Sequence, residues 1–129
     1  MITAASNSRI KRLVQLNQKS KLRRTEDVFL AEGVKMFLEA PREQLQEVYD
    51  SESFLDKCSC REHLEEVGYE VVSDSVFSKI SDTCTPQGVL CVLKQFHYNI
   101  EEMLRDKAPL FLLLEKIQDP GNLGTMLRT

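Results

Sequence analysis

The sequence predicts an α/β protein, a small three-layer α/β/α sandwich followed by the start of a second unit. Short apolar runs that suit buried strands alternate with segments whose apolar residues recur at helical spacing. This alternation favours right-handed crossovers and a mostly parallel sheet. At 129 residues, of which 42% are apolar and 29% charged, the chain can bury one core and the beginning of another.

The strands and helices of the first unit are expected within residues 1–95. Strands are predicted at 28–31, 45–49, 69–72 and 89–93. Helices are predicted at 8–17, 34–40, 53–57, 61–67 and 74–80. Gly68 follows the fourth of these helices as a terminating glycine. Residues 19–25 are basic and lack apolar periodicity, so the sequence indicates a flexible loop there.

A linker and a second unit are expected after the sandwich. Residues 96–108 contain a charged amphipathic helix at 99–106, and the five apolar residues 110–114 predict a strand covered on both faces. Asp119, Pro120 and Gly121 favour a turn, after which Asn122 suits the N-cap of a helix. A strand that leads through such a loop into a helix is a frequent anion-binding arrangement in α/β proteins.

The charges are distributed unevenly along the chain. Residues 1–28 carry a net charge of +5, whereas residues 29–129 carry −8, although the whole chain has a net charge of only −3. This asymmetry indicates a basic surface for phosphates on an acidic body, with a merely solvated helix face as the alternative. The residues predicted to contact RNA are Lys11, Arg12, Lys19, Lys21, Arg23 and Arg24.

Several other classes of protein receive no support from the sequence. The longest apolar run has five residues, against about 20 for a membrane span, and no signal peptide is evident, so a cytoplasmic protein without membrane contact is expected. The four cysteines are expected to be free thiols, with Cys84 and Cys91 small buried hydrophobic residues. No metal site is predicted, because Cys58, Cys60 and His63 lack a fourth ligand.

Four ordered segments resemble one enzyme family. The C-terminal segment Asp119-Pro-Gly-Asn122-x-Gly124-x-x-x-Arg128 is similar to the first signature motif of the SpoU (TrmH-type) RNA 2′-O-ribose methyltransferases of the SPOUT superfamily. Upstream, the segments at 2–13, 29–40 and 81–89 resemble the start, the first strand–helix junction and the end of the family's N-terminal substrate-binding domain. The four segments span the whole chain in the family's order.

The resemblance implies an organisation and an activity. It implies an RNA substrate-binding domain with a ribosomal-protein-like fold at 1–95, a linker at 96–108, and the truncated start of a trefoil-knot methyltransferase domain at 109–129. The implied cofactor is S-adenosylmethionine, bound by a C-terminal part that this chain lacks. Methylation of RNA, in particular ribosomal RNA, by a full-length homodimer is therefore expected, whereas the 129-residue chain alone is expected to be an inactive, monomeric fragment.

The resemblance also implies roles for individual residues. Arg128 would grip the ribose-phosphate and orient the 2′-hydroxyl, since an arginine pKa above about 12 makes it a poor general base. Asn122 would fix the loop and help position Arg128, whereas Gly124 would be structural. Glu32 is expected to make local hydrogen bonds.

Two alternatives remain open at this stage. The first is a stand-alone ribosomal-protein-like RNA-binding module without catalysis. The second is a nucleotide-binding enzyme that holds phosphate with Gly121 and Gly124, which is weakly supported because the chain lacks the G-x-G-x-x-G spacing and a Walker lysine.

Overall fold

The computed structural model describes residues 1–129 and divides them into two compact units, Met1–Phe96 and His97–Thr129. The first unit contains a four-stranded sheet, whose strands are β1 (Val28–Glu32), β2 (Leu45–Ser51), β3 (Glu70–Val72) and β4 (Val89–Lys94). Their order in the sheet is β1-β4-β2-β3. No helix of the chain is long and apolar enough to cross a membrane.

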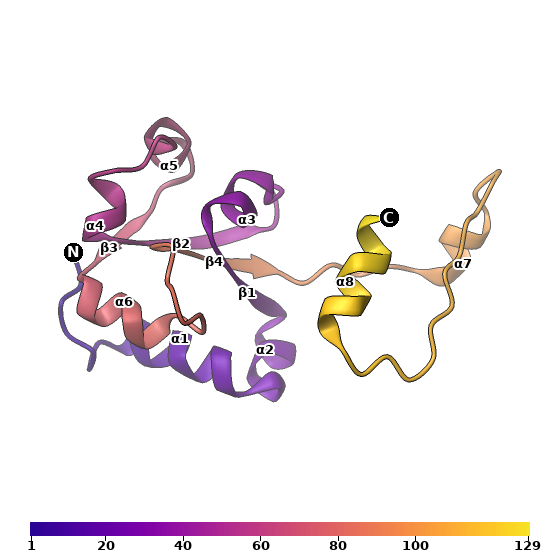
Figure 1. Ribbon diagram of the computed structural model, residues 1–129, viewed down its shortest axis with the longest axis horizontal. Coiled ribbons are helices and arrows are strands. Elements are labelled where there is room, and N and C mark those ends of the chain that lie inside the picture. Colours follow the sequence, from indigo (N-terminus) through magenta and orange to yellow (C-terminus); the bar gives the residue numbers. More distant parts are fainter. The chain divides into compact units, whose positions relative to one another are not determined.

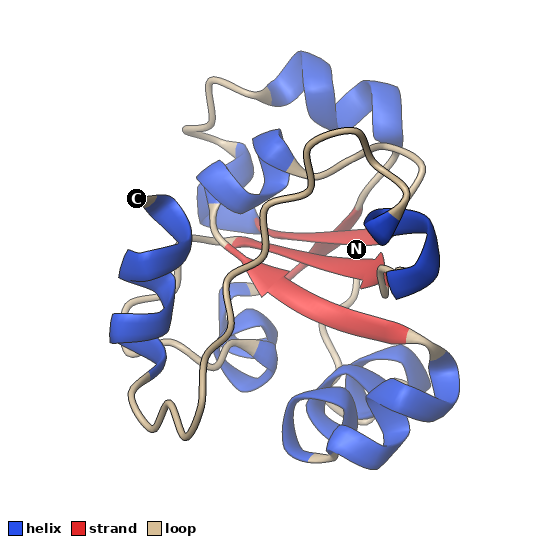
Figure 2. Ribbon diagram, turned by 90° about the vertical axis from the view of Figure 1, so that its right-hand side faces the viewer, coloured by secondary structure: helices blue, strands red, loops and turns tan.

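Helices cover both faces of this sheet, which confirms the three-layer architecture. In Figure 1, one layer contains α1 (Ser8–Gln18), α2 (Ser20–Glu26) and α6 (Asp74–Ile80). The opposite layer contains α3 (Val34–Glu39), α4 (Glu52–Leu55) and α5 (Arg61–Val67). Figure 2 shows the strands in red between the two helical layers.

Each face of the sheet has its own apolar core. Because successive strand residues point to opposite faces, Tyr49 packs with α1 and α6, whereas its neighbour Val48 packs on the other side. Leu13 and Phe77 lie in the first core, and Phe37 in the second. Both cores therefore depend on the same strands, and β4 is buried along nearly its whole length.

The sheet is mixed, so the prediction of a mostly parallel sheet was wrong. Only β2 and β3 are parallel, whereas β4 runs antiparallel to both β1 and β2. The reason lies in residues 81–88, which precede β4. The Ser51 amide donates to the Gly88 carbonyl at 2.8 Å, and Glu32 accepts hydrogen bonds from Ser81 and Thr83. These bonds bring β4 into the sheet at the edge where β1 and β2 end.

Residues 20–26 form α2 instead of the predicted flexible loop. Residues 20–26 show no helical periodicity because α2 buries no residue fully, and only Leu22 packs against the first core. Hydrogen bonds to the neighbouring elements supply the missing stabilisation. The Arg23 guanidinium donates to the Leu16 and Asn17 carbonyls, and the Gln95 side chain donates to the Arg23 carbonyl at 3.3 Å.

The second unit contains α7 (Ile100–Leu104) and α8 (Pro120–Arg128) but no strand. The strand predicted at 110–114 was wrong, because the unit offers no neighbouring strand with which this segment could pair. The helix also begins earlier than predicted. Its N-cap is Asp119 rather than Asn122, with Asp119 Oδ1 accepting from the Gly121 amide at 2.8 Å and Pro120 in the first turn.

All four cysteines are free thiols, as predicted. Cys91 is buried on β4, but Cys84 is exposed. The prediction of a buried Cys84 was wrong because this residue lies in the polar loop at 81–88, where neighbouring residues are also exposed.

Candidate nucleic-acid interface

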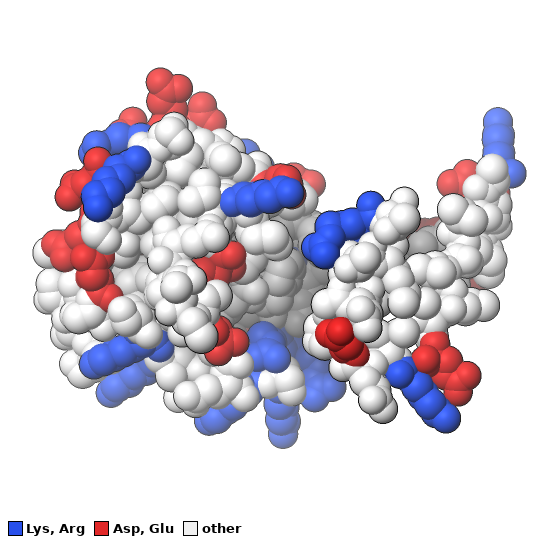
Figure 3. Space-filling view, in the orientation of Figure 1, with Lys and Arg blue, Asp and Glu red and all other residues white.

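Basic side chains gather over α1 and α2. In Figure 3 they follow the lower edge of the first unit, where these two helices lie. Helix α1 is started by Asn7, whose side chain accepts a hydrogen bond from the Arg9 amide at 2.9 Å. Its apolar residues Ile10, Leu13 and Leu16 are buried, so the intervening basic residues are directed away from the core.

Arg12 is one of the predicted RNA-binding residues, but it is held by two carboxylates. Its guanidinium lies 2.7 Å from Glu26 and 2.8 Å from Glu47. Glu47 also accepts a hydrogen bond from the hydroxyl group of the buried Tyr49. Burial raises the pKa of Tyr49, and the Glu47 carboxylate raises it further. Arg12 therefore joins α1 to α2 and β2, and its charge is largely compensated within the protein.

Arg23 also has a structural role. Its Nη1 donates to the Leu16 and Asn17 carbonyls in the last turn of α1, where carbonyls have no partner within the helix. A guanidinium at the C-terminus of a helix additionally complements the helix dipole. Arg23 therefore closes α1 and fixes the start of α2 against it.

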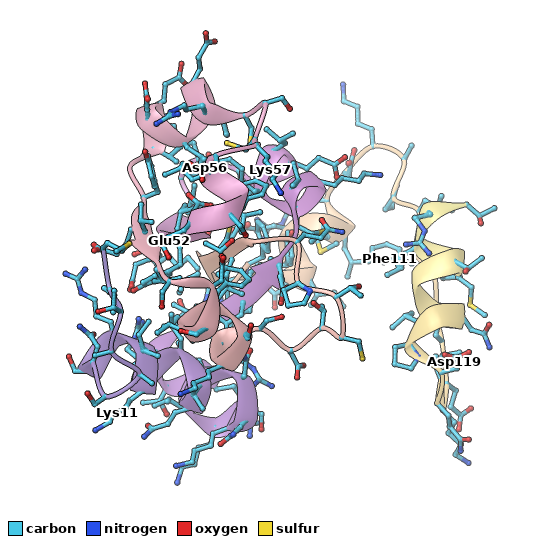
Figure 4. All side chains as sticks on the ribbon, turned by 60° about the vertical axis from the view of Figure 1, so that its left-hand side comes forward. Lys11, Glu52, Asp56, Lys57, Phe111 and Asp119 are labelled. Atoms are coloured by element: carbon cyan, nitrogen blue, oxygen red, sulfur yellow. The ribbon has the colours of Figure 1, made fainter.

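The other four predicted RNA-binding residues are exposed and have no carboxylate within ion-pair distance. They are Lys11, Lys19, Lys21 and Arg24. Figure 4 shows Lys11 pointing from α1 into solvent. Lys19 and Lys21 line a shallow surface depression of about 470 Å³ at the junction of α1 and α2. We call these four residues the free basic set, and it is the part of the predicted interface whose charge remains uncompensated.

A second polar cluster surrounds Glu32 at the end of β1. Its carboxylate accepts hydrogen bonds from the Ser81 hydroxyl at 2.9 Å, from the Thr83 hydroxyl at 2.8 Å and from the Asp82 amide at 3.3 Å. The structure thus gives Glu32 a hydrogen-bonding role, as the sequence predicted, but its partners are about 50 residues away rather than local. These hydrogen bonds also connect two of the segments that resemble the methyltransferase family, residues 29–40 and 81–89.

Gly33 and Gln87 belong to the same contact between the end of β1 and residues 81–88, which we call the Glu32 junction. Gly33 has φ of +115°, a conformation that favours glycine, and a Cβ there would lie 2.8 Å from Gln87 Oε1. That oxygen accepts a hydrogen bond from the Val34 amide at 3.1 Å. Gln87 therefore satisfies a donor in the first turn of α3, a role that sequence reasoning missed.

Asp50 is a second residue that sequence reasoning missed. It is fully buried on β2, and neither carboxylate oxygen has a hydrogen-bond partner. Burial raises the pKa of Asp50 to about 7 and that of Cys91 to about 12. The sequence offered no signal for this, because β2 also contains Glu47, a second acidic residue that is not buried. No group of three or more His, Cys, Asp or Glu side chains is arranged to hold a metal ion, and His63 instead packs edge-on against Phe37.

The predicted catalytic residues Asn122 and Arg128 both lie on α8 and are exposed. The Arg128 guanidinium lies back along the helix, with Nη2 3.5 Å from the position of a Cβ at Gly124. Since this is an ordinary van der Waals distance, α8 itself does not require glycine at this position. The roles of Asn122, Gly124 and Arg128 in catalysis stay predictions.

Comparison with models of protein families identifies the family to which the first unit is similar. The family model of the MRM3-like substrate binding domain matches residues 7–91. The chain belongs to this family. The MRM3-like match covers both α1–α2 and the Glu32 junction, so the free basic set lies inside it.

Individual proteins extend the similarity beyond the MRM3-like domain. The chain is 34% identical over 131 residues to the 23S rRNA (guanosine(2553)-2′-O)-methyltransferase RlmP of Bacillus subtilis, an alignment that covers 99% of the chain and 49% of RlmP. A crystal structure of an RNA 2′-O ribose methyltransferase superposes with a TM-score of 0.67 at 25% identity, covering 98% of the chain and 50% of that protein. The predicted resemblance is confirmed, and the chain spans about half the length of these proteins.

A third protein shares the fold at lower identity. The AdoMet-bound rRNA methyltransferase of Sinorhizobium meliloti superposes with a TM-score of 0.64 at 18% identity, covering 78% of the chain and 38% of that protein.

Proposed function

We propose that this chain is the RNA-recognition part of an S-adenosylmethionine-dependent RNA 2′-O-ribose methyltransferase that acts on ribosomal RNA. The observation that carries the proposal is the free basic set on α1–α2 within an MRM3-like substrate binding domain. The rRNA substrate is supported by the printed activity of RlmP, and the cofactor by the AdoMet-bound S. meliloti protein.

The free basic set suits a phosphate backbone more than a particular base sequence. Lysine and arginine side chains that contact phosphates release counterions from the RNA, which makes binding strongly salt-dependent. Arg12 and Arg23 contribute less to this effect, since their guanidinium groups are occupied by protein partners. The domain boundaries at 1–95, 96–108 and 109–129 remain part of the proposal.

The experiment is a salt series of RNA binding by the 129-residue chain. Replacing all four residues of the free basic set with alanine should weaken binding at low salt and reduce the slope of log K against log salt by roughly 3, at about 0.7 per single-strand phosphate contact. Lys35→Ala/Lys57→Ala, which removes two exposed lysines from the other helical layer, is the matched control. An unchanged slope in the fourfold variant would contradict the proposal.

Arg128 is proposed to position the ribose-phosphate in the whole protein. Its guanidinium stays protonated at neutral pH, so it can hold a phosphate in bidentate fashion but is unsuited to remove a proton. Arg128→Ala should lower methyl transfer from labelled S-adenosylmethionine by the whole protein while leaving RNA binding by residues 1–129 intact. Full transfer activity in this variant would remove Arg128 from the mechanism, and absence of transfer by the unaltered protein would favour the non-catalytic RNA-binding module.

The resemblance assigns no cofactor-binding residue to this chain. We therefore propose that the 129 residues bind RNA without transferring a methyl group. Homodimerisation is proposed on the resemblance alone, and sedimentation of the whole protein tests it. A cytoplasmic location likewise remains a proposal.

A further inference from the structure

A shallow surface depression of about 460 Å³, called here the cavity, lies between the first turns of α1, the middle of β2 and the start of β3. Its lining includes Val48, Tyr49 and Tyr69, together with two arginines and two glutamates. Val48 and Tyr49 are only 4% and 1% exposed, so Tyr69 is the apolar side chain most accessible to a ligand. The space beside Gly68 is open, since a Cβ there would have no atom within 4 Å, and it is the φ of +78° that favours glycine at this position. This volume and this mixture of apolar wall and few polar groups are typical of sites for small planar ligands.

Two of the four charged residues in the cavity, Arg12 and Glu47, already have two protein partners each. Arg12 uses Nε and Nη2 on Glu26 and Nη1 on Glu47. Glu47 accepts from Arg12 with one oxygen and from the Tyr49 hydroxyl with the other. These groups shape the cavity but have little capacity left for a ligand.

Arg9 and Glu70 differ from this pair. They form a single contact of 3.1 Å between Arg9 Nη1 and Glu70 Oε2, with side chains 61% and 36% exposed. Such an exposed ion pair contributes only about 0–1 kcal/mol to stability and can rearrange readily. Arg9 retains further N–H donors and Glu70 a second acceptor oxygen, so the cavity offers adjacent donors and acceptors beside an apolar wall.

We propose that this cavity binds one unstacked nucleobase of the RNA, and that guanine fits it best. The Watson–Crick edge of guanine presents two adjacent donors, N1–H and the 2-amino group, which a carboxylate such as Glu70 can accept together. The guanine O6 and N7 atoms are the acceptors that arginine pairs with most often. Adenine, cytosine and uracil lack two adjacent donors, so they leave one carboxylate oxygen unpaired.

The position of the cavity agrees with RNA binding by the same helix. Arg9 and Lys11 of the free basic set both lie in the first turns of α1, but side chains two residues apart point to different sides of a helix, so the RNA has to pass around the start of α1 to reach both. A strand held through its phosphates on α1–α2 could therefore place a splayed base in the cavity, which is the usual mode of sequence-specific recognition of single-stranded RNA. This inference rests on the proposed RNA-binding function and adds base selectivity to it.

The test compares short single-stranded RNAs that differ at one position. The 129-residue chain is titrated with an adenine- and uracil-containing oligonucleotide with one central guanine, and with versions carrying adenine, cytosine or uracil there. We expect roughly tenfold tighter binding of the guanine version. Glu70→Gln, which leaves one acceptor in place of two, should abolish this preference without changing the salt slope.

Exchanging the charges of Arg9 and Glu70 distinguishes a role in binding the base from a role in stabilising the fold. The double variant Arg9→Glu/Glu70→Arg can restore the ion pair across α1 and β3 but places the donors and acceptors in the wrong order for guanine. We expect it to fold, to bind RNA with the same salt slope and to lack the guanine preference. A preference that survives in Glu70→Gln or returns in the exchanged protein would overturn the inference.

The two proposals fail in different ways. If the unaltered chain binds all four oligonucleotides equally, with a salt slope that depends on the free basic set, the base-binding cavity is wrong and the RNA-binding function stands. If the chain binds none of them, the proposed function fails as well.

Discussion

The two units contain similar apolar residues but differ in what surrounds them. In the first unit Leu13, Phe77 and Ile80 are at most 2% exposed, because helices and strands pack on them from several directions. In the second unit Leu110 and Leu113 are 97% and 94% exposed. Apolar sequence alone therefore does not produce a strand. It needs neighbouring strands whose backbone groups and side chains complete the sheet and the core.

The largest effect on the free energy of unfolding is expected when a side-chain truncation in the first unit is compared with one in the second. Phe77→Ala should lower the free energy of unfolding by about 3–5 kcal/mol, because it leaves a cavity in the first core. Leu113→Ala should change it by less than about 0.5 kcal/mol, since the side chain is already in solvent. Denaturant unfolding of the 129-residue chain measures both. A large loss in Leu113→Ala would show that the exposed segment packs in solution.

The second prediction concerns the buried acid of the first unit. The pKa of Asp50 is about 7 in the folded chain, above the value near 4 of an unfolded aspartate. The folded state then binds the proton more tightly, so stability should be greatest below about pH 4 with respect to this group. It should fall as the pH rises to about 7, by roughly 2–4 kcal/mol in total.

Asp50→Asn removes this titration and keeps the size of the side chain. The difference in unfolding free energy between pH 5 and pH 8 should shrink by roughly 2–4 kcal/mol compared with the unaltered chain. Asp56→Asn, on the surface after α4 (Figure 4), is the control and should leave the difference unchanged. The same pH dependence in Asp50→Asn as in the original chain would mean that Asp50 is hydrated or paired.

The third prediction tests the junction between β1 and residues 81–88. Glu32→Ala should cost about 1–3 kcal/mol, because the Ser81 and Thr83 hydroxyls and the Asp82 amide lose their shared acceptor. Hydrogen exchange should accelerate in residues 81–88 before it does in the strands. Glu39→Ala, at an exposed position on α3, controls for the change of charge. Unchanged exchange in this loop would show that Gly88 and Gln87 suffice to hold it.

The smallest expected stability effect comes from two neighbouring arginines. Arg23→Ala should cost about 1–2 kcal/mol, because two carbonyls at the end of α1 lose a charged donor. Arg24→Ala should be neutral in stability within about 0.5 kcal/mol but should weaken RNA binding. The reverse pattern, with Arg24 supporting stability and Arg23 binding, would contradict the division between structural and free basic residues.

Local periodicity predicted most elements of the first unit, but not how they pair. The spacing of Ile10 and Leu13 and the stop at Gly68 are local features, and the structure confirms the helices that they indicate. The direction of β4 depends on bonds to Glu32 and Ser51, which are distant in sequence. Likewise, α2 is stabilised by hydrogen bonds to other elements rather than by an apolar face of its own.

The candidate interface shows the same limit. The predicted set contained the basic residues of α1–α2 except Arg9, but charge counting could not separate Arg12 and Arg23 from the others, because their partners come from Glu47 and from the end of α1. Nor could it show that Asp50 lies inside the sheet without a partner. Both facts depend on which side chains the tertiary fold brings together.

The central place of β4 in the sheet has a consequence for synthesis on the ribosome. This strand is the last of the four in sequence, yet it lies between β1 and β2, and β1 pairs with no other strand. Until residues 89–94 have left the exit tunnel, the nascent chain can form helices and the β2–β3 pair. It cannot yet connect β1 to that pair, because β4 lies between them. The first unit should therefore fold late and in one step, once nearly all of its residues have been made.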